Sequence, residues 1–456
     1  MHEMDTITAL ATPPGHGSIA VIRISGPETY QIADRLLRVR GPAPSERAPY
    51  TFAFGHISTG GVDLDECLML FMRAPHSFTG EDVVEIQGHG GPVVSGRILR
   101  AVIEAGARPA EPGEFSRRAF LNGRIDLVQA EAVNDLIRSQ SDRAAAAALE
   151  QLEGALSRRF NDLYDELLTV AADLEATLDF PDDELPPAVT VEIFRRLEAV
   201  REHLAGLIAT WDEGHMLREG VSVVISGKPN TGKSTLLNAL LGRERAIVSE
   251  VPGTTRDFIE EGLILDGIPL RIIDTAGLRV TDCGIEQEGI ERTQKHLQAS
   301  DVQIFIIDSS IGLDPWDREH MDALDPARSV VVLNKTDLGS RVEHEALAPL
   351  TVVETTLLSP AGAVPVLRAL SGKLRHGIDP SVPPHAVISE RHRGHLSLAL
   401  AETKQAIELS RHPDEAQHIL AASSLRQALE SLGAVTGRTY QESLLESIFS
   451  RFCIGK

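Results

Sequence analysis

Residues 227–234, Gly227-Lys-Pro-Asn-Thr-Gly-Lys-Ser234, follow the pattern G-x-x-x-x-G-K-S and decide the fold of the middle of the chain. The six residues before them, 221–226 (VSVVIS), are mostly β-branched or apolar and predict a buried strand. Residues 235–241 (TLLNALL) predict a helix that ends at Gly242. Because a strand, this loop and a helix follow one another, the stretch predicts a phosphate-binding loop and not a chance glycine-rich turn.

The residue types of this loop, called the P-loop below, suit a chain of phosphates. Glycines allow backbone N–H groups to surround a phosphate, and the N-terminus of the following helix adds partial positive charge. We expect Lys233 to reach the β- and γ-phosphates and Ser234 to offer its hydroxyl to Mg²⁺.

Three further motifs follow in the order found in GTPases. Residues 252–257 (PGTTRD) supply hydroxyls that can complete Mg²⁺ coordination only while a γ-phosphate is present, so this segment is a switch released by hydrolysis. Residues 270–277 (LRIIDTAG) predict a strand ending in D-x-x-G. There Asp274 can hold a Mg²⁺-bound water, and the Gly277 N–H can contact the γ-phosphate. Residues 330–337 (VVVLNKTD) predict another strand, which ends in N-K-x-D.

The N-K-x-D motif selects the base. The carboxylate of Asp337 can accept hydrogen bonds from N1–H and the exocyclic amine of guanine, whereas adenine would leave it unpaired. Burying a charged group without a partner is costly, so discrimination should be strong and GTP is the expected nucleotide. Residues 359–361 (SPA) are the best candidate for the loop behind the base, although Pro360 removes a backbone donor.

The residue after D-x-x-G is Leu278, where small GTPases commonly have a glutamine that orients the attacking water. Leucine can neither donate nor accept a hydrogen bond. Hydrolysis is therefore slow without a partner, or another group takes this role. Glu286 and Glu288 are the local candidates, and the residues alone do not separate them from solvated charges of a switch loop.

Residues 1 to about 120 have a mixed α/β pattern. The predicted elements are strands at 19–24, 68–72 and 83–86 and a helix at 93–105. Polar side chains lie beside tight turns at 77–82 (SFTGED) and 87–91 (QGHGG). The first turn is either a ligand-binding loop or a hairpin turn with a solvated Glu81, and residue types alone favour the hairpin turn.

The remaining segments are helical. Apolar residues at spacings of three and four from Leu149 to Leu178 predict one helix of about eight turns. A second amphipathic helix is predicted from Ile193 up to the strand at 221–226 that precedes the P-loop. More helices follow a Pro-rich connector and run over residues 389–450, with a break at His412-Pro413. These segments form either one bundle interrupted by an insertion or two separate bundles.

The composition sets outer bounds. A chain of 456 residues is long enough for about three domains. No run approaches the roughly 18 apolar residues of a membrane span, and the N-terminus lacks the layout of a signal peptide, so we expect a cytoplasmic protein. The net charge of −22 repels nucleic acid, so RNA binding requires a local basic patch or a basic partner. Cys67, Cys283 and Cys453 are too dispersed for a disulfide framework or a Cys-rich zinc site.

With these residues identified, the whole chain resembles the MnmE (TrmE) family of tRNA-modification GTPases. The GTPase motifs would fit several families, and the specific segments lie nearer the two ends of the sequence. These segments are residues 11–15 (ATPPG), 22–26 (IRISG), 78–82 (FTGED), 87–91 (QGHGG), 112–116 (PGEFS), 118–126 (RAFLNGRID) and 452–456 (FCIGK).

The resemblance implies a multidomain α/β and α protein. A P-loop, Ras-like GTPase domain (218–375) would be inserted in an all-helical domain (120–217 plus 376–456). An α+β domain for tetrahydrofolate binding and dimerisation (1–119) would precede both. The resemblance thus favours one interrupted bundle over two.

The resemblance also implies a function. The family forms homodimers and works with the FAD-dependent flavoprotein MnmG in a heterotetramer. Together they add a carboxymethylaminomethyl or aminomethyl group at C5 of the wobble uridine of certain tRNAs, with K⁺- and Mg²⁺-dependent GTP hydrolysis. The one-carbon unit comes from 5-formyl- or methylene-tetrahydrofolate. The alternative, from another class, is a GTP-dependent assembly or signalling switch without folate chemistry.

Site residues are implied position by position. For folate they are Arg23, Glu81, Arg124 and Lys456. The resemblance therefore favours a ligand-binding loop over a hairpin turn at Glu81. The implied K⁺ ligands are Asn230, Ser249, Val251 and Thr254, and the Mg²⁺ ligands are Ser234 and Thr255. Glu286 corresponds to the glutamate that orients water, and Cys453 is a candidate catalytic thiol. The expected GTP set is Asn230, Thr231, Gly232, Lys233, Ser234, Thr235, Ser249, Glu250, Val251, Pro252, Gly253, Thr254, Thr255, Asp274, Thr275, Ala276, Gly277, Asn334, Lys335, Thr336, Asp337 and Ser359.

Overall fold

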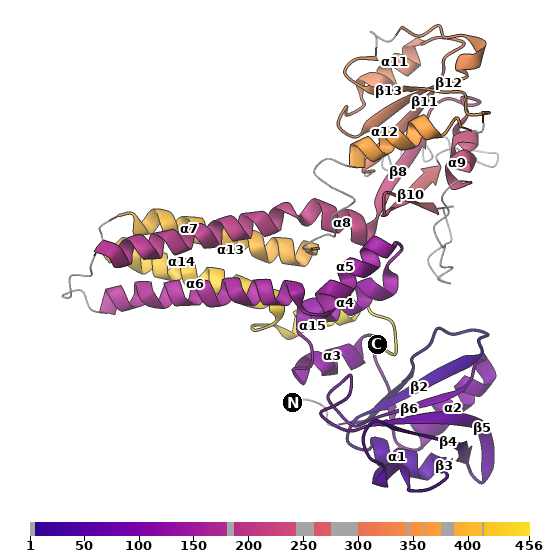
Figure 1. Cartoon of the computed structure of the whole chain (residues 1–456), viewed down its shortest axis with the longest axis vertical. Helices are drawn as coiled ribbons and strands as arrows, with labels where there is room; N and C mark the ends of the chain where they lie inside the picture. Colours follow the sequence, from indigo (N-terminus) through magenta and orange to yellow (C-terminus); the bar gives the residue numbers. More distant parts are fainter. Residues whose placement is uncertain are drawn as a thin grey trace, which may run out of the picture. The chain divides into compact units, whose positions relative to one another are not determined.

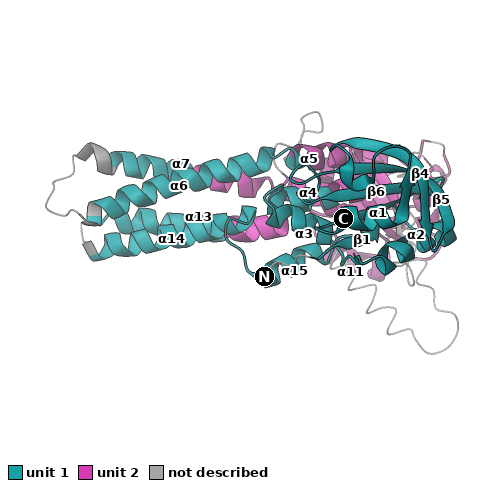
Figure 2. Ribbon diagram, turned by 90° about the horizontal axis from the view of Figure 1, so that it is seen from below, with its two compact units in different colours: residues 1–134, 151–201, 398–456 teal, residues 135–150, 202–397 magenta. Residues whose placement is uncertain are grey.

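The structure is a computed structural model, and it describes residues 5–179, 187–242, 260–274, 300–343, 347–359, 361–374, 387–412 and 415–456. The chain divides into two compact units (Figure 2). The first contains Met1–Asn134, Gln151–Arg201 and Leu398–Lys456, and the second contains Asp135–Glu150 and Glu202–Ser397. The division into three domains predicted from the sequence stays a prediction.

The first unit begins with a seven-stranded sheet in the order β3-β4-β5-β6-β2-β1-β7, antiparallel except for the β1–β7 pair (Figure 1). Its strands are β1 (Ile7–Leu10), β2 (Ile19–Ser25), β3 (Leu37–Val39), β4 (Thr51–Thr59), β5 (Val62–Met72), β6 (Val83–His89) and β7 (Arg108–Pro109). The three predicted strands are confirmed within β2, β5 and β6. Two helices, α1 (Thr29–Leu36) and α2 (Pro92–Glu104), accompany the sheet, and α2 confirms the predicted helix.

One face of this sheet forms the core of the N-terminal region. Side chains such as Ile24, Met69 and Ile86 are fully buried there together with Ile32 of α1 and Ile98 of α2. Strand residues alternate between the two faces. The alternate residues of β4 therefore point away from this core, and they include exposed phenylalanines.

The helical part of the first unit joins segments that precede the GTPase motifs in the sequence with segments that follow them. Its helices, some of which extend into the second unit, are α3 (Glu114–Leu121), α4 (Leu127–Arg138), α5 (Asp142–Leu152), α6 (Ala155–Asp179), α7 (Pro187–Ala209), α13 (Glu390–Ser410), α14 (Glu415–Thr436) and α15 (Glu442–Phe449). Helices α6 and α14 pack side by side (Figure 2). Arg426 pairs with Glu175 at 2.7 Å, and Arg438 pairs with Asp165 at 2.9 Å. One interrupted bundle is thus confirmed.

The predicted helix of about eight turns across residues 149–178 is wrong. Helix α5 ends at Leu152, and α6 begins at Ala155. Gly154 lies between them with a φ of 83°, a left-handed conformation that ends a helix. The apolar spacing continued across this glycine, so periodicity alone did not reveal the break. The second helix, predicted from Ile193 up to the strand before the P-loop, is also divided. Helix α7 ends at Ala209, and α8 begins at Trp211.

The second unit contains a six-stranded sheet in the order β13-β12-β11-β8-β10-β9, parallel except for β9. Its strands are β8 (Val221–Ser226), β9 (Glu260–Leu265), β10 (Ile268–Asp274), β11 (Val302–Asp308), β12 (Ser329–Asn334) and β13 (Thr351–Glu354). Its helices are α8 (Trp211–Glu219), α9 (Lys233–Leu241), α11 (Pro315–Asp322) and α12 (Val364–Leu374). The predicted strand, P-loop and helix are confirmed as β8, the loop and α9.

This sheet explains why the GTPase motifs follow strands. Strand β12 is buried throughout, as expected of a parallel strand covered on both faces. The P-loop follows β8, Asp274 ends β10, and the N-K-x-D motif begins at the last residue of β12. Because these parallel strands end at the same edge, the motifs are brought to one side of the sheet.

The C-terminal segment lies against the N-terminal sheet within the first unit. The backbone N–H of Gly113 donates to the carbonyl of Cys453 at 3.4 Å. Gly113 has a φ of 69°, and a Cβ there would lie 2.5 Å from the Phe449 carbonyl oxygen. At the end of the segment, a Cβ on Gly455 would lie 2.5 Å from the Leu10 carbonyl oxygen. These backbone approaches are close enough to require glycine.

None of the helices in the described part of the chain combines the length and the apolar character needed to cross a membrane.

Two glycines with the same backbone conformation allow this close approach to be tested. Gly113 and Gly123 both have a φ of 69°, but nothing lies within 4 Å of a Cβ placed on Gly123. We expect Gly123→Ala to cost about 1–2 kcal/mol from the left-handed conformation alone. Gly113→Ala should cost more and reduce amide protection in α15, measured by hydrogen exchange and urea unfolding. Equal effects of the two substitutions would contradict this account.

Candidate functional site

The two glycines of the P-loop are required by contacts with neighbouring strands. Gly227 has a φ of 138°, and a Cβ there would lie 2.3 Å from the Ile306 carbonyl oxygen in β11. Gly232 has a φ of 112°, and a Cβ there would lie 2.3 Å from Nδ2 of Asn334. The glycines of the sequence pattern thus allow the loop to pass close to β11 and to the N-K-x-D motif.

Between these glycines, the loop is fixed by its own hydrogen bonds. Thr231 Oγ1 donates to the Lys228 carbonyl at 2.9 Å, and Lys233 Nζ donates to the carbonyls of Gly227 at 2.7 Å and Lys228 at 2.6 Å. Asn230 has a φ of 64°, a conformation that asparagine tolerates better than most residues. The ammonium group of Lys233 therefore lies within the curve of the loop, where it can meet phosphate oxygens.

The first turn of α9 presents hydroxyl groups beside the loop. Ser234 is exposed, and Thr235 is half-buried. An exposed hydroxyl at a helix N-terminus next to a phosphate-binding loop can serve as a Mg²⁺ ligand. The role of Ser234 as a Mg²⁺ ligand stays a prediction.

Asn334 of the N-K-x-D motif connects two loops. It is buried, with only 4% of its surface exposed. Its Nδ2 donates to the Thr231 carbonyl at 2.7 Å, and its Oδ1 accepts from the Leu357 N–H at 3.0 Å. Asn334 therefore connects the P-loop to the loop that follows β13.

Lys335 and Asp337 complete the motif. Lys335 Nζ donates to Asp308 Oδ2 at 2.6 Å. Burial opposes ionisation of Asp308, but hydrogen bonds from Lys335 and Ser310 outweigh it and lower the pKa of Asp308. Asp337 is exposed, and its Oδ1 accepts from Thr356 Oγ1 at 3.1 Å. A carboxylate fixed in this way on an open edge can accept hydrogen bonds from a guanine.

Sequence reasoning missed Thr356 and Leu357, which contact Asp337 and Asn334. The proposed base-backing residue Ser359 lies further along this loop, where its N–H donates to the Thr356 carbonyl at 2.9 Å. A signal was available, because Thr356 and Leu357 follow closely after the strand β13. The role of Ser359 stays a prediction.

Much of the predicted switch lies outside the described residues. These positions are Ser249, Glu250, Val251, Pro252, Gly253, Thr254, Thr255, Thr275, Ala276, Gly277, Leu278, Glu286 and Glu288. For Asp274 only the backbone is described, and it pairs with Ile225 of β8, the strand that leads into the P-loop.

In the first unit, Arg23 of β2 connects the sheet to the C-terminal segment. Its Nε donates to Glu85 Oε1 at 2.8 Å, and its Nη1 donates to the Gly455 carbonyl at 3.4 Å. The guanidinium group lies 5.7 Å and 5.5 Å from the ring centroids of Phe78 and Phe115. These rings stabilise the positive charge of Arg23.

Lys456 is brought beside Arg23 by this arrangement. Its backbone N–H donates to the Cys453 carbonyl at 3.3 Å. Burial and the neighbouring Arg23 guanidinium lower the pKa of Lys456. Two cations and one carboxylate, Glu85, leave a net positive charge here, which favours an anionic ligand. Cys453 itself is exposed and unbonded to another cysteine among the described residues.

The predicted residues Glu81 and Arg124 meet at the loop before β6. Ser25 Oγ of β2 donates to Glu81 Oε2 at 2.7 Å, and Arg124 Nε donates to the Ser77 carbonyl at 3.1 Å. Ser77 Oγ in turn donates to the Glu81 carbonyl at 2.6 Å. The four predicted folate residues therefore lie around β2 and this loop. Arg23 and Lys456 lie at the C-terminal segment, and Glu81 and Arg124 lie at residues 77–81.

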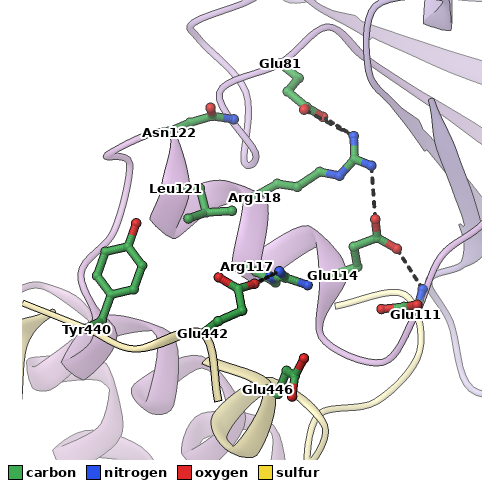
Figure 3. A pocket seen from close by; sticks show the side chains of 10 residues that line it. All are labelled: Glu81, Glu111, Glu114, Arg117, Arg118, Leu121, Asn122, Tyr440, Glu442 and Glu446. Carbon is green, nitrogen blue, oxygen red and sulfur yellow. Dashed lines mark hydrogen bonds and ion pairs between the residues drawn. The ribbon is translucent and has the colours of Figure 1, made fainter. Parts of the chain in front are cut away.

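Arg118 of α3 joins Glu81 to a larger ionic network (Figure 3). Arg118 is 8% exposed, and its guanidinium contacts Glu81 at 3.2 Å, Glu114 at 3.0 Å and Asp5 at 2.6 Å. Burial alone would raise the pKa of Glu114, but hydrogen bonds from Arg108 and Arg118 outweigh this effect, so the pKa is lowered. Sequence reasoning missed this network, because its members are up to 113 positions apart.

A pocket of ≈ 450 Å³ borders this network, within the first unit. Glu81, Glu114 and Arg118 line one side, and Tyr440 and Glu442 line the other (Figure 3). Five glutamates and two arginines contribute to its wall, so the wall is mainly acidic. Glu81 thus belongs both to the wall of this acidic pocket and to the loop at residues 77–81.

Residues 6–124 match the family described as GTP-binding protein TrmE N-terminus, and residues 127–453 match the family described as MnmE helical domain. Relatives called tRNA modification GTPase MnmE include proteins from Geobacter metallireducens, at 44% identity over 100% of both chains, and Moorella thermoacetica, at 42% identity over 99% of both.

Another relative of that name, from Lactiplantibacillus plantarum, is 39% identical over 100% of this chain and 99% of its own. Among solved structures, the G domain of the T. maritima FeoB iron transporter is 24% identical over 34% of this chain and 96% of that chain, with a TM-score of 0.25. The two family matches and the full-length relatives lead to one conclusion: the chain belongs to the MnmE family of tRNA modification GTPases.

Proposed function

We propose that this GTPase works with an FAD-dependent partner of the MnmG type to add a carboxymethylaminomethyl or aminomethyl group at C5 of the wobble uridine of certain tRNAs. The observation that carries the proposal is the meeting of Arg23, Lys456 and Glu81 around β2. A GTP switch of the assembly or signalling class has no need of such a site. In this proposal the GTPase domain (218–375) is inserted in a helical domain (120–217 plus 376–456), after a folate domain (1–119).

The residues around β2 suit a tetrahydrofolate derivative, which supplies the one-carbon unit when bound. Arg23 and Lys456 can bind the carboxylates of its glutamate tail, and Arg124 adds a third cation. Glu81 can accept hydrogen bonds from the amino-substituted edge of the ring system. Its orientation is fixed by Ser25 and Arg118, so the carboxylate is prepared before a ligand arrives.

In the GTPase domain, Lys233 and the backbone of the P-loop bind the phosphates, and Asp337 binds guanine. Ser234, with Thr255, is suited to Mg²⁺. The left-handed Asn230 lies on the open side of the loop, where its side-chain oxygen can serve a K⁺ ion. The further proposed K⁺ ligands are Ser249, Val251 and Thr254. Because Leu278 cannot orient water, we assign that role to Glu286.

The N-terminal sheet carries an apolar surface suited to a second copy of the chain. Phe52 and Phe54 of β4 are 71% and 60% exposed, and they pair with Leu70 and Leu68 of β5. Exposed aromatic residues in neighbouring positions are typical of interaction sites. This surface supports a homodimer, which joins the flavoprotein in a heterotetramer. We place the complex in the cytoplasm, where tRNA is modified.

The net charge of −22 bears on the RNA contact. Such a charge opposes binding of the tRNA backbone at long range. We therefore assign much of the tRNA contact to the flavoprotein partner.

Mass analysis of wobble uridines tests the proposed function directly. In tRNA from a strain that lacks this protein, we expect the modified uridine to disappear and to return when the gene is restored. Unchanged uridines would refute the proposal and would favour a GTP-dependent assembly or signalling switch without folate chemistry.

Lys456→Gln should weaken binding of 5-formyl-tetrahydrofolate roughly tenfold, because one charge-assisted hydrogen bond is lost. The lowered pKa of Lys456 adds a pH signature. Its positive charge is present below that pKa and lost as the pH rises through it, so affinity should fall at a lower pH than for an ordinary lysine. Calorimetric titration over a pH series measures both effects.

The matched control is Arg97→Gln, which removes an exposed cation from α2. It should leave folate affinity and its pH profile unchanged. Guanine-nucleotide affinity should be the same in all three proteins. A Lys456→Gln variant with normal affinity and a normal profile would refute the assignment of Lys456.

Asn230→Gly should abolish stimulation of GTP hydrolysis by K⁺ over Na⁺, a difference that we expect to be roughly tenfold or more in the unmodified protein. Glycine accepts the positive φ of this position, so the variant removes the side-chain oxygen without straining the loop. Rates measured in KCl and NaCl at equal ionic strength test this. Turnover that is indifferent to the cation in the unmodified protein would remove the proposed role of Asn230.

A further inference from the structure

Lys228 occupies a position that the P-loop pattern leaves open. Its Nζ donates to Asp317 Oδ2 at 2.8 Å, pairs with Asp314 and lies 5.3 Å from the centroid of the Trp316 ring. All three partners lie at the N-terminal end of α11. The second residue of the P-loop is therefore bound to a helix that none of the GTPase motifs includes.

The carboxylates that receive Lys228 are themselves fixed. Asp314 is the N-cap of α11, where its Oδ1 accepts from the Asp317 N–H at 3.0 Å. Asp317 Oδ2 accepts from the Asp314 N–H at 3.2 Å in return. This reciprocal arrangement is a capping box, which sets both side chains before Lys228 approaches. The Asp317 side chain is only 6% exposed, so this contact is better shielded than an ordinary surface ion pair.

The backbone of Lys228 supports the loop from the other side. Its carbonyl accepts hydrogen bonds from Thr231 Oγ1 at 2.9 Å and from Lys233 Nζ at 2.6 Å. The same residue thus combines a side chain bound to α11 with a carbonyl that positions the phosphate-binding lysine.

We propose that Lys228 is a positioning residue for nucleotide binding. Its ion pairs with Asp314 and Asp317 fix the P-loop in the conformation that receives the phosphates, and α11 thereby sets the rate of nucleotide release. Without these pairs, the loop samples other conformations, and bound nucleotide escapes faster. The inference depends only on the GTPase activity of the family and is independent of folate and of tRNA chemistry.

Release of a fluorescent GDP analogue from the full-length protein, chased with excess GDP, tests the proposal. Lys228→Met should raise the dissociation rate constant roughly tenfold, in line with the loss of one hydrogen bond to a charged group. The KM for GTP should rise, while kcat at saturating GTP stays within about twofold. Lys228→Arg, which can reach both carboxylates, should restore slow release.

Asp317→Asn provides a second variant should Lys228→Met fail to fold. It removes the charge but keeps an oxygen to accept the Asp314 N–H, so α11 retains its cap. Its release rate should also rise, and the double variant Lys228→Met with Asp317→Asn should be no faster than Lys228→Met alone, because both changes remove one interaction. Fully additive effects, or release within twofold of the unmodified protein, would overturn the proposal.

The control is Lys373→Met. Lys373 is half-buried in α12, and its ammonium donates to the Pro326 carbonyl at 2.6 Å. Removing this cation changes the net charge as Lys228→Met does but leaves the P-loop contacts intact. Release from this variant should match the unmodified protein. Acceleration equal to that of Lys228→Met would show an effect of net charge and would refute the role of the contact with α11.

Discussion

The packing of α14 against α6 is the contact on which the arrangement of the first unit depends. In the sequence, α6 precedes the GTPase motifs and α14 follows them. The pair Arg426–Glu175 connects the two helices, and Arg438, just after the end of α14, pairs with Asp165 of α6. Because the chain returns to its own bundle, α15 and the residues after it reach α3 and the N-terminal sheet. The meeting of Lys456 and Arg23 is a consequence of helix packing, not of local sequence.

Ion pairs then fix the orientation of the side chains that helix packing brings together. Arg118 is largely buried among Asp5, Glu81 and Glu114, which come from separate parts of the N-terminal region. A buried guanidinium loses hydration, so each of these contacts is needed to offset that cost. The result is a carboxylate, Glu81, whose orientation is set by Ser25 and Arg118. In the folate site that we propose, this carboxylate receives the polar edge of the ring system, and Arg23 and Lys456 receive the anionic tail.

The parts of this structure that follow from short-range rules were predictable from the sequence. Strands β8 and β12 and the P-loop were located because β-branched runs and glycines act within a few residues. The break at Gly154 was not, since apolar spacing continued through it. The partners of Asn334 and Arg118 were not predictable either, because they meet only after distant segments have folded together. Thr356 and Leu357 were missed because the search for the loop behind the base settled on residues 359–361 (SPA), which include Ser359.

Asn334 carries a further consequence. Its single buried amide group accepts from the loop after β13 and donates to the P-loop. The two loops are therefore coupled through one side chain, and a shift of one is transmitted to the other. In the nucleotide site that we propose, this coupling links the recognition of guanine to the retention of the phosphates.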